Sequence, residues 1–547
     1  MQSTEIPRNV PPQARPTFGT LVGTYVKHGN RDYLARLLQI WSPAMDEVEG
    51  TALMSSALHR AIFIGDEPAV RMILKAGVSP TVQDSQLYSP LATAAEAGQR
   101  DIARLLWELV GPDGRAAPLP SPNCLVVAAE KGHADLVADF LDMWDGWSME
   151  EKRQALRSAT GYWRDSVVDV LLAKVAYEAD TIQQALDVAV TKQPILPVAR
   201  WGSFVPVTKD EDDLRQQRVV YHLIDAGANL DVLASGAKIP LLHVAAEWRH
   251  RLGALKGLLD KGANANVRDG SGKTALHRLF HRHSSSSADP LRVLLQHGAS
   301  PELADKTGET GLHAAAHTGT LEQFQLCLTA CRDEDAALRL RNSYDESLLH
   351  YAAAGGREDT VRFLLSRGLD ANAANANGWT PLICALMPAK VRRCYPQCSL
   401  ASLLLEHGAS AQAVTEEGWT ALHALASYPS GYLGLSLDNW NDVAPLVREL
   451  IARGAPLDAE VSSLRNPAAS YKMFVSPKPD AWGVRMRSFA RNWGGAASSS
   501  SAAVKPVGNG GEGTGTTPQM WARRNGANEV VKAIQEHQAE AAGEATS

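Results

Sequence analysis

Cysteines and long apolar runs are both scarce in this chain. Its six cysteines, spread over 547 residues, are too few for the disulfide framework that holds small secreted domains together. No stretch approaches the roughly 18 consecutive apolar residues of a membrane-spanning helix. Residues 1–16 are polar and proline-rich and lack the apolar core of a signal peptide. We therefore expect a soluble protein of the cytoplasm, the nucleus or both, with no membrane attachment.

The chain also lacks a dense run of basic residues. Its formal net charge is −6 and its pI is about 6.3. Because the neutralisation of phosphates needs clustered cations, we expect no direct binding to nucleic acid. The basic stretch Lys390–Arg393 is too short to be a convincing nuclear import signal. Hydrophobic residues make up 45% and charged residues 21% of the chain, values that are ordinary for a folded protein.

Catalytic signatures are missing as well. The sequence contains no Gly-x-Ser-x-Gly elbow, kinase loop or catalytic Cys/His signature. Gly270–Thr274 resembles part of a phosphate-binding loop, but the full signature needs a glycine where this chain has Val267, and a strand before the turn. We therefore predict that the chain is not an enzyme and that it holds no cofactor.

What the chain does contain is a repeated Leu-His phrase. The leucines Leu242, Leu276, Leu312, Leu349, Leu382 and Leu422 step by 34, 36, 37, 33 and 40 residues, and all but Leu382 are followed by histidine. An apolar run and a glycine follow each repeat about two helical turns later. A period of this length indicates stacked units of supersecondary structure, because no single unit can bury its apolar face alone.

Each repeat carries signals for two helices. Threonines at the start of the phrase are predicted N-caps, since a hydroxyl can accept from free amides of the first turn; they are Thr274, Thr310, Thr380 and Thr420. Pro381 follows its cap directly, where a missing N–H costs nothing. The glycines after the apolar runs are predicted to end helices in a left-handed conformation; they are Gly262, Gly298, Gly368, Gly408 and Gly454.

These units resemble ankyrin repeats, whose pattern is Gly-x-Thr-Pro-Leu-His-x-Ala-Ala, then Val-x-x-Leu-Leu, then Gly-Ala. The best matches are Gly272–Asp305, Ser343–Asn375, Gly378–Val414 and Gly418–Asp458. The resemblance covers residues 18–459 and 515–537. It implies an all-α solenoid of about twelve helix-pair units, several of them degenerate, with a disordered C-terminal insertion.

The repeats and their interruptions give a predicted domain organisation. It consists of an N-terminal tail (1–17), a cap with repeats (18–141), degenerate repeats (142–234) with a loop insertion (191–215), well-matched repeats (235–459), a divergent segment (460–514), a capping repeat (515–537) and a tail (538–547). The acidic run Asp210–Asp213 is assigned to the loop insertion. The Gly/Ser/Ala-rich stretch 494–516 cannot bury enough apolar surface to order itself and is predicted to be disordered.

Histidine and cysteine clusters raise the alternative of a metal site. His277 and His281 are four residues apart on a helix, but no acidic general base completes a metalloprotease motif. Cys327/Cys331 and Cys394/Cys398 form two Cys-x-x-x-Cys pairs, whereas structural zinc normally uses tighter knuckles and four converging ligands. The resemblance implies instead that the repeated histidine bonds within the turn between units. We predict no metal ion.

The resemblance also implies a binding surface, lined by the first helices and the projecting turns. The variable residue before each cap belongs to that surface; in order these are Ser55, Tyr88, Lys273, Glu309, Glu346, Trp379 and Trp419. Tryptophan is a typical interface anchor. Trp379 and Trp419 are therefore predicted partner contacts, with Tyr88, Lys273, Glu309 and Glu346. The alternative is that the two indoles pack on their own turns.

Three hypotheses for function follow. The first is a non-enzymatic scaffold or adaptor, a monomer that binds one or more proteins through its concave face and turn tips. The second is a nuclear transcription co-regulator that binds a transcription factor rather than DNA. The third is an enzyme or substrate-adaptor with a site hidden in an insertion, although Pro194–Asp213 and Tyr428–Asn441 are short for an active site.

Overall fold

The structure is a computed structural model of the 547-residue chain. It describes residues 31–40, 49–115, 123–192, 209–230, 239–247, 252–281, 288–387, 398–427, 443–461 and 516–544. The chain divides into two compact units, Met1–Asn264 and Ala265–Ser547, and each is described by itself. The described part of both units is helical, with no β-strand beyond isolated bridges.

The described residues of the first unit form a single helix followed by six helix pairs. The single helix is α2 (Arg31–Ile40). The pairs are α3 (Glu49–Phe63) with α4 (Glu67–Lys75), α5 (Pro90–Ala97) with α6 (Arg100–Arg115), α7 (Cys124–Lys131) with α8 (Ala134–Met143), α9 (Met149–Gly161) with α10 (Asp165–Lys174), α11 (Ala179–Thr191) with α12 (Lys209–Asp225), and α13 (Leu241–Glu247) with α14 (Gly253–Asp260).

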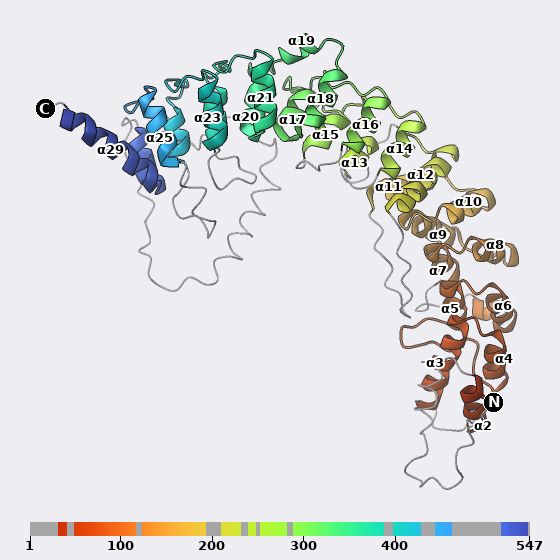
Figure 1. Ribbon diagram of the computed structural model, residues 1–547. Helices are drawn as coiled ribbons and strands as arrows, with labels where there is room; N and C mark the ends of the chain where they lie inside the picture. The colour runs from red at the N-terminus through yellow and green to blue at the C-terminus, as the bar shows by residue number, and fades with distance from the viewer. Residues whose placement is uncertain are drawn as a thin grey trace, which may run out of the picture. The chain divides into compact units, whose positions relative to one another are not determined.

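The described residues of the second unit form six further pairs and one extra short helix. Most of them are labelled in Figure 1. The pairs are α15 (Ala275–His281) with α16 (Asp289–Gln296), α17 (Gly311–Thr318) with α18 (Leu321–Thr329), α20 (Leu348–Gly355) with α21 (Glu358–Ser366), α22 (Pro381–Leu386) with α23 (Cys398–Glu406), α24 (Ala421–Leu425) with α25 (Val443–Ala452), and α28 (Pro518–Asn525) with α29 (Asn528–Glu544). The extra helix is α19 (Glu334–Leu338).

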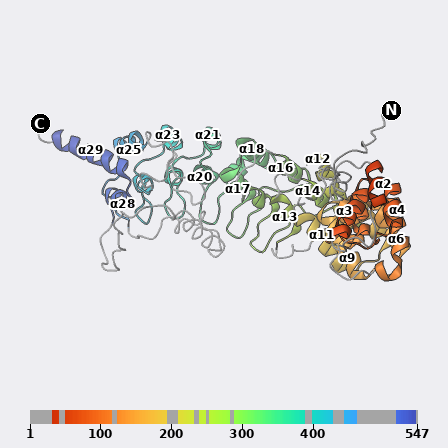
Figure 2. The same cartoon turned by 90° about the horizontal axis from the view of Figure 1, so that it is seen from below.

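Within each unit the pairs stack in register. The first helix of each pair contacts the first helix of the next pair; α17 contacts α20, and α20 contacts α22. The second helices contact one another in the same way; α23, for example, contacts α25. In the second unit the two sets form separate rows, with α18, α21 and α23 in one and α17 and α20 in the other (Figure 2). The prediction of an all-α solenoid of about twelve helix pairs is confirmed. The eroded repeats from Cys124 to Leu172 are confirmed as the pairs α7–α8 and α9–α10.

The capping signals work as the sequence predicts. The hydroxyls of Thr310, Thr380 and Thr420 accept from the amides of His313, Ile383 and His423, three residues further on. Pro381 occupies the first turn of α22. The five glycines predicted to end helices all have φ between 80° and 91°. This left-handed backbone is costly for any residue with a side chain, which explains why the slot holds glycine.

The core is made of the facing sides of the stacked helices. The alanine pairs Ala315-Ala316 and Ala352-Ala353 are fully buried, so α17 and α20 approach closely. Leucines and valines of the second helices close the other side; Leu294, Val361, Leu364 and Leu404 are fully buried. Burial of this kind stabilises each pair only through its neighbours.

Two predicted boundaries are wrong. Residues Lys209–Asp213 do not belong to a loop, because they form the first turn of α12. Acidic side chains at that position interact favourably with the free amides and positive end of the helix dipole. The predicted tail 538–547 is helical as far as Glu544, since α29 continues through a stretch rich in alanine and glutamate, which are strong helix formers.

The last helix pair joins the stack across a long stretch of chain. Val461 and Thr516 form an antiparallel bridge, in which the amide of Val461 donates to the Thr516 carbonyl over 3.2 Å. Equivalent bridges link Ala304 to Thr310 and Arg341 to Ser347, only six residues apart. Helix α28 contacts α24, and α29 contacts α25. The predicted capping repeat is therefore part of the stack, and the 54 residues 462–515, which lie outside the described residues, take the place of one ordinary turn.

Candidate protein-binding surface

A tight turn precedes five of the first helices in the second unit, α15, α17, α20, α22 and α24. We call these five segments the projecting turns: Asp269–Thr274, Asp305–Thr310, Asn342–Ser347, Asn375–Thr380 and Thr415–Thr420. The side chain of the first residue closes each turn. In the second turn, for example, Asp305 Oδ1 accepts from the amides of Thr307 at 2.8 Å and Glu309 at 3.0 Å. The local sequence thus fixes the turn before any stacking occurs.

Neighbouring projecting turns are bonded to each other through their backbones. In each case a backbone amide of one turn donates to a backbone carbonyl of the turn before it. The four bonds are Lys306 N to Ser271 O at 3.1 Å, Ser343 N to Thr307 O at 2.9 Å, Ala376 N to Tyr344 O at 2.9 Å, and Glu416 N to Asn377 O at 3.1 Å. The five turns therefore form one continuous row. A row whose members are held at both ends is a preorganised surface, which reduces the ordering cost of binding.

The repeated histidines tie each turn to the next. His350 Nδ1 accepts from the amide of Ser347 over 3.1 Å, so the ring proton lies on Nε2, which is 3.0 Å from the carbonyl oxygen of Trp379. His277 makes the same link to the Glu309 carbonyl at 2.9 Å, and His423 to Thr516 at 3.0 Å. Burial lowers the pKa of His350 and of His423 to about 4. The implied structural role of these histidines is confirmed, and it requires the neutral ring.

Trp379 and Trp419 do not lie on the surface. Their exposed fractions are 1% and 0%. The Trp419 ring packs 5.7 Å from the His423 ring and 5.5 Å, edge-on, from the Trp521 ring of the last helix pair. The prediction that these two indoles contact a partner is therefore wrong. The residue before the cap turns back into the stack, where a large ring fills the space between successive repeats.

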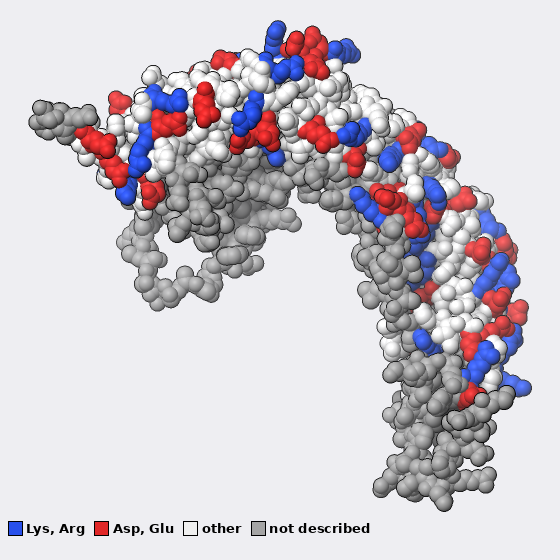
Figure 3. All heavy atoms as spheres, in the orientation of Figure 1, with Lys and Arg blue, Asp and Glu red and all other residues white. Residues whose placement is uncertain are grey.

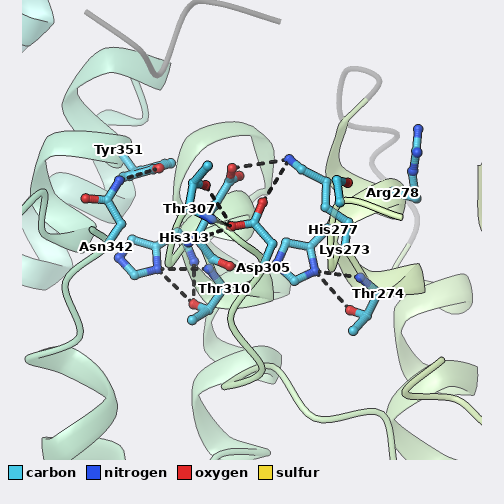
Figure 4. Close-up of polar contacts among 12 residues, drawn as sticks. Lys273, Thr274, His277, Arg278, Asp305, Thr307, Thr310, His313, Asn342 and Tyr351 are labelled. Atoms are coloured by element: carbon cyan, nitrogen blue, oxygen red, sulfur yellow. Dashed lines mark hydrogen bonds and ion pairs between the residues drawn. The ribbon is translucent and has the colours of Figure 1, made fainter. Parts of the chain in front are cut away.

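Glu346 is buried for the same reason. Its carboxylate accepts from the Asn342 amide group over 2.6 Å and from the Asn375 amide group over 3.3 Å. Burial raises the pKa of Glu346. The Asn342 amide group also donates to the Tyr351 hydroxyl over 3.0 Å (Figure 4). The prediction that Glu346 is a partner contact is wrong, because its side chain belongs to this internal polar cluster.

Lys273 and Glu309 meet at the edge of the row. The Lys273 ammonium lies 3.3 Å from Glu309 Oε2 and 3.6 Å from Asp305 Oδ2 (Figure 4). The side chains of Lys273 and Glu309 are 26% and 22% exposed. They are the two members of the predicted set that the structure brings together, and they remain within reach of a partner. An ion pair at such a site contributes little to stability.

Tyr88 belongs to the first unit. It ends a turn of the same kind, in which Asp84 Oδ1 accepts from the amides of Gln86 and Tyr88, each over 2.9 Å. Its side chain is half-buried, and burial raises the pKa of its hydroxyl. In the same turn Leu87 is 47% exposed and has φ 64°, at the position where four projecting turns have glycine.

The exposed residues of the row lie at the turn tips, before the pre-cap position. We call the following residues the tip row: Lys306, Thr307, Ser343, Asp345, Ala376, Asn377 and Glu416. Sequence reasoning selected the residue next to the cap and missed these. The signal was present, because all of them except Asp345 stand between the residue that closes the turn and the residue with positive φ, and Asp345 is itself the positive-φ residue of its turn.

The cysteine and histidine clusters show no converging ligands. The Cys331 thiol donates to the Cys327 carbonyl over 3.2 Å, and burial raises the pKa of Cys331 to about 12. Such a thiol is inert as a nucleophile or metal ligand at neutral pH. Cys394 lies outside the described residues. Within the described ranges, no three His, Cys, Asp or Glu side chains come together in a way that could hold a metal ion.

Charges of both signs alternate on the face seen in Figure 3. Near α19 and α21, for example, Arg367 lies 3.6 Å from both Glu334 and Asp335, and Arg362 lies 3.0 Å from Glu358. An extended patch of one sign is what phosphate backbones select, and that face of the described residues does not show one. No helix of the described residues has the length and apolar character needed to cross a membrane.

Comparison with known proteins identifies the repeat. The family model for ankyrin repeats (3 copies) matches residues 242–335, 282–375, 326–392 and 349–435. This part of the chain consists of ankyrin repeats, and ankyrin repeats imply protein–protein interaction.

Individual relatives match parts of the chain. The putative ankyrin repeat protein FPV230 of fowlpox virus (strain NVSL) is 28% identical over 184 residues, which are 34% of this chain and 93% of the viral protein. The mouse RelA-associated inhibitor is 31% identical over 119 residues, which are 22% of this chain and 13% of that protein. Among solved structures, the ankyrin repeat domain of Bcl-3, described as a unique member of the IkappaB protein family, is 27% identical with a TM-score of 0.29, covering 40% of this chain and 88% of that one.

Proposed function

We propose that the protein is a non-enzymatic scaffold or adaptor, and that the row of projecting turns with the adjoining first helices binds a protein partner. The observation that carries this proposal is the backbone bonding of one turn to the next, from Ser271 O to Lys306 N and onward to Glu416 N. It gives the tip row a fixed shape. Fixed, exposed and chemically mixed side chains suit recognition of another protein, since specificity then depends on which residues stand at the tips.

The test compares a triple variant and a double variant of the full chain as baits in a quantitative pull-down. The tip variant replaces Lys306, Asn377 and Glu416 by alanine; these side chains are exposed and lie outside the stacking contacts. The matched control replaces the exposed Arg362 and Arg448 of α21 and α25, on the second helices. Both must first show wild-type circular dichroism and melting.

We expect the tip variant to lose a partner that the control retains. Equal recovery of every partner by the two baits would contradict the proposal, since it would separate binding from the projecting turns. Loss from the control alone would place binding on the second helices and would also contradict the proposal.

A second candidate is a nuclear transcription co-regulator that binds a transcription factor and not DNA. The similarity to the mouse RelA-associated inhibitor favours it, although the matched region is 13% of that protein. The two candidates differ in where the protein works. A tagged full-length copy that is excluded from the nucleus under all growth conditions would eliminate the co-regulator and leave the scaffold.

A further inference from the structure

The inserted helix α19 forms one wall of a cleft. The insertion follows α18, and Asp333 caps α19 by accepting from the amides of Asp335 at 2.9 Å and Ala336 at 3.0 Å. Between α19 and the chain after α21 lies a cavity of about 270 Å³. Its walls come from the end of α19, from Arg339 and Arg341, and from residues 367–373. All of these residues belong to the second unit.

The cleft has an apolar floor and a basic rim. Leu338 and Ala373 are buried at its base, with Leu369 half-buried beside them. Arg339 and Arg341 are exposed on its rim. A floor of this kind accepts aliphatic carbons, and the rim accepts a charged end group.

Two of the three arginines that line the cleft have partners of their own. Arg367 lies 3.6 Å from the carboxylates of Glu334 and Asp335, and its guanidinium packs 5.6 Å from the Phe363 ring centroid. Arg341 donates to the Asp345 carbonyl over 2.9 Å and to its carboxylate over 3.1 Å. These contacts hold the two guanidinium groups in place.

The third arginine has no counter-ion. Among the residues that the structure describes, none forms an ion pair or hydrogen bond with the guanidinium of Arg339. The two acids in the lining are already engaged: Asp335 faces Arg367, and Asp370 Oδ1 accepts from the amide of Asn372 over 2.8 Å. Arg339 therefore presents an uncompensated, forked donor at the mouth of the cleft.

We infer that this cleft binds an acidic side chain, carried on a peptide segment of a protein partner. The methylene groups of a glutamate would lie on Leu338 and Leu369, while its carboxylate would meet the guanidinium of Arg339. The cavity is smaller than the roughly 300–1,000 Å³ of pockets for drug-sized ligands, which suits one side chain with its flanking main chain. None of the residues that line the cleft belongs to the tip row, although Arg341 is bonded to Asp345 of that row. Arg339 contacts no tip-row residue among those described, so variants at Arg339 test this site independently of the proposed function.

The experiment measures binding of a defined probe to the full-length protein. The probe is a fluorescein-labelled twelve-residue peptide of alternating glycine and glutamate, followed by fluorescence anisotropy at low and at physiological salt. We expect saturable binding that the Arg339→Ala variant weakens about tenfold, as the loss of a charge-assisted hydrogen bond predicts. Arg339→Lys should restore part of the affinity, since it keeps the charge without the fork.

Two controls make the result specific. Arg362→Ala removes an equally exposed arginine of α21 that does not line the cleft, and it should leave binding unchanged. A peptide with glutamine in place of glutamate should bind at least tenfold more weakly. The inference is overturned by absence of saturable binding to the wild type, by equal binding of the glutamine peptide, or by equal loss in the Arg362 and Arg339 variants. The Arg339 side chain is exposed and makes no bond to the described part of the chain, so its replacement should not disturb folding.

Discussion

Replacing Trp419 by alanine should weaken the attachment of the last helix pair to the stack. The indole is fully buried and packs edge-on against Trp521, so its removal takes away an apolar contact between the turn before α24 and helix α28. Truncation of a buried tryptophan to alanine costs about 3–5 kcal/mol. The polar links that remain are the Trp521 indole bond to Ser427 Oγ at 2.9 Å, the His423 link to Thr516, the Val461–Thr516 bridge and the Arg448–Glu536 ion pair at 3.2 Å. Such bonds contribute only about 1 kcal/mol each, so the last pair would then depend mainly on the packing of α29 against α25.

Trp419→Phe makes the reasoning quantitative. Within the described part of the chain, the buried Trp419 Nε1 has no hydrogen-bond partner, and an unpaired buried donor costs about 1–3 kcal/mol. Phenylalanine loses some packing but also removes that unpaired group. We therefore expect a net cost below about 1 kcal/mol, well under the cost of alanine.

The assay is urea unfolding followed by hydrogen exchange of residues 516–544. The alanine variant should lose exchange protection in α28 and α29 while α17 and α20 keep theirs, because repeats are stabilised by nearest neighbours. An alanine variant within about 1 kcal/mol of wild type, or a phenylalanine variant as damaged as alanine, would refute the reasoning.

Three further predictions concern titration and strain. Burial lowers the pKa of His350 to about 4, so the neutral ring stabilises the fold above pH 6.5 and that contribution is lost as pH falls from 6.5 toward 4. The free energy of unfolding in urea should therefore fall over this window, by at most about 3 kcal/mol for this residue, and His350→Gln should make it less dependent on pH. Burial raises the pKa of Glu346, so its negative charge destabilises the fold as pH rises above the ordinary glutamate pKa of 4.5. Glu346→Gln should therefore raise the free energy of unfolding by about 1 kcal/mol at pH 7 and by nothing near pH 4.5, and a stabilisation that persists in acid would contradict this. Leu87→Gly removes the strain of a left-handed leucine backbone, about 1–2 kcal/mol, and adds the conformational entropy cost of glycine, about 0.5–1 kcal/mol. The melting temperature should therefore rise slightly, and a fall would show that the exposed leucine packs on its own repeat.

Most of the fold follows from the sequence because its signals are local. The period of the Leu-His phrase, the threonine caps and the glycine stops each act within a few residues, and stacking then has only one consistent register. Even the last pair could be predicted across the interruption, since Thr517–Met520 and Gly526–Asn528 carry the same signals as the other repeats.

The candidate surface could be predicted only in part, because a side chain's direction depends on its neighbours. The phrase Gly-Trp-Thr is the same whether the indole points outward or into the stack. Trp419 is buried by Trp521, which lies 102 positions further along the chain, and no local pattern reveals that contact. The cleft at α19 was equally hidden, because it depends on how an insertion rests against residues 367–373 of the following repeat.

The bridge between Val461 and Thr516 has a consequence for how the end of the protein is held. The stack is continuous in space at this point but not along the backbone, since the two residues that touch are separated by 54 others. Docking of the final helix pair on the stack is therefore an intramolecular association, and the covalent link between Val461 and Thr516 gives it a high effective concentration. A single peptide-bond cut within residues 462–515 would turn this first-order docking into a second-order one. The cut protein would then keep its last repeat when concentrated and lose it on dilution.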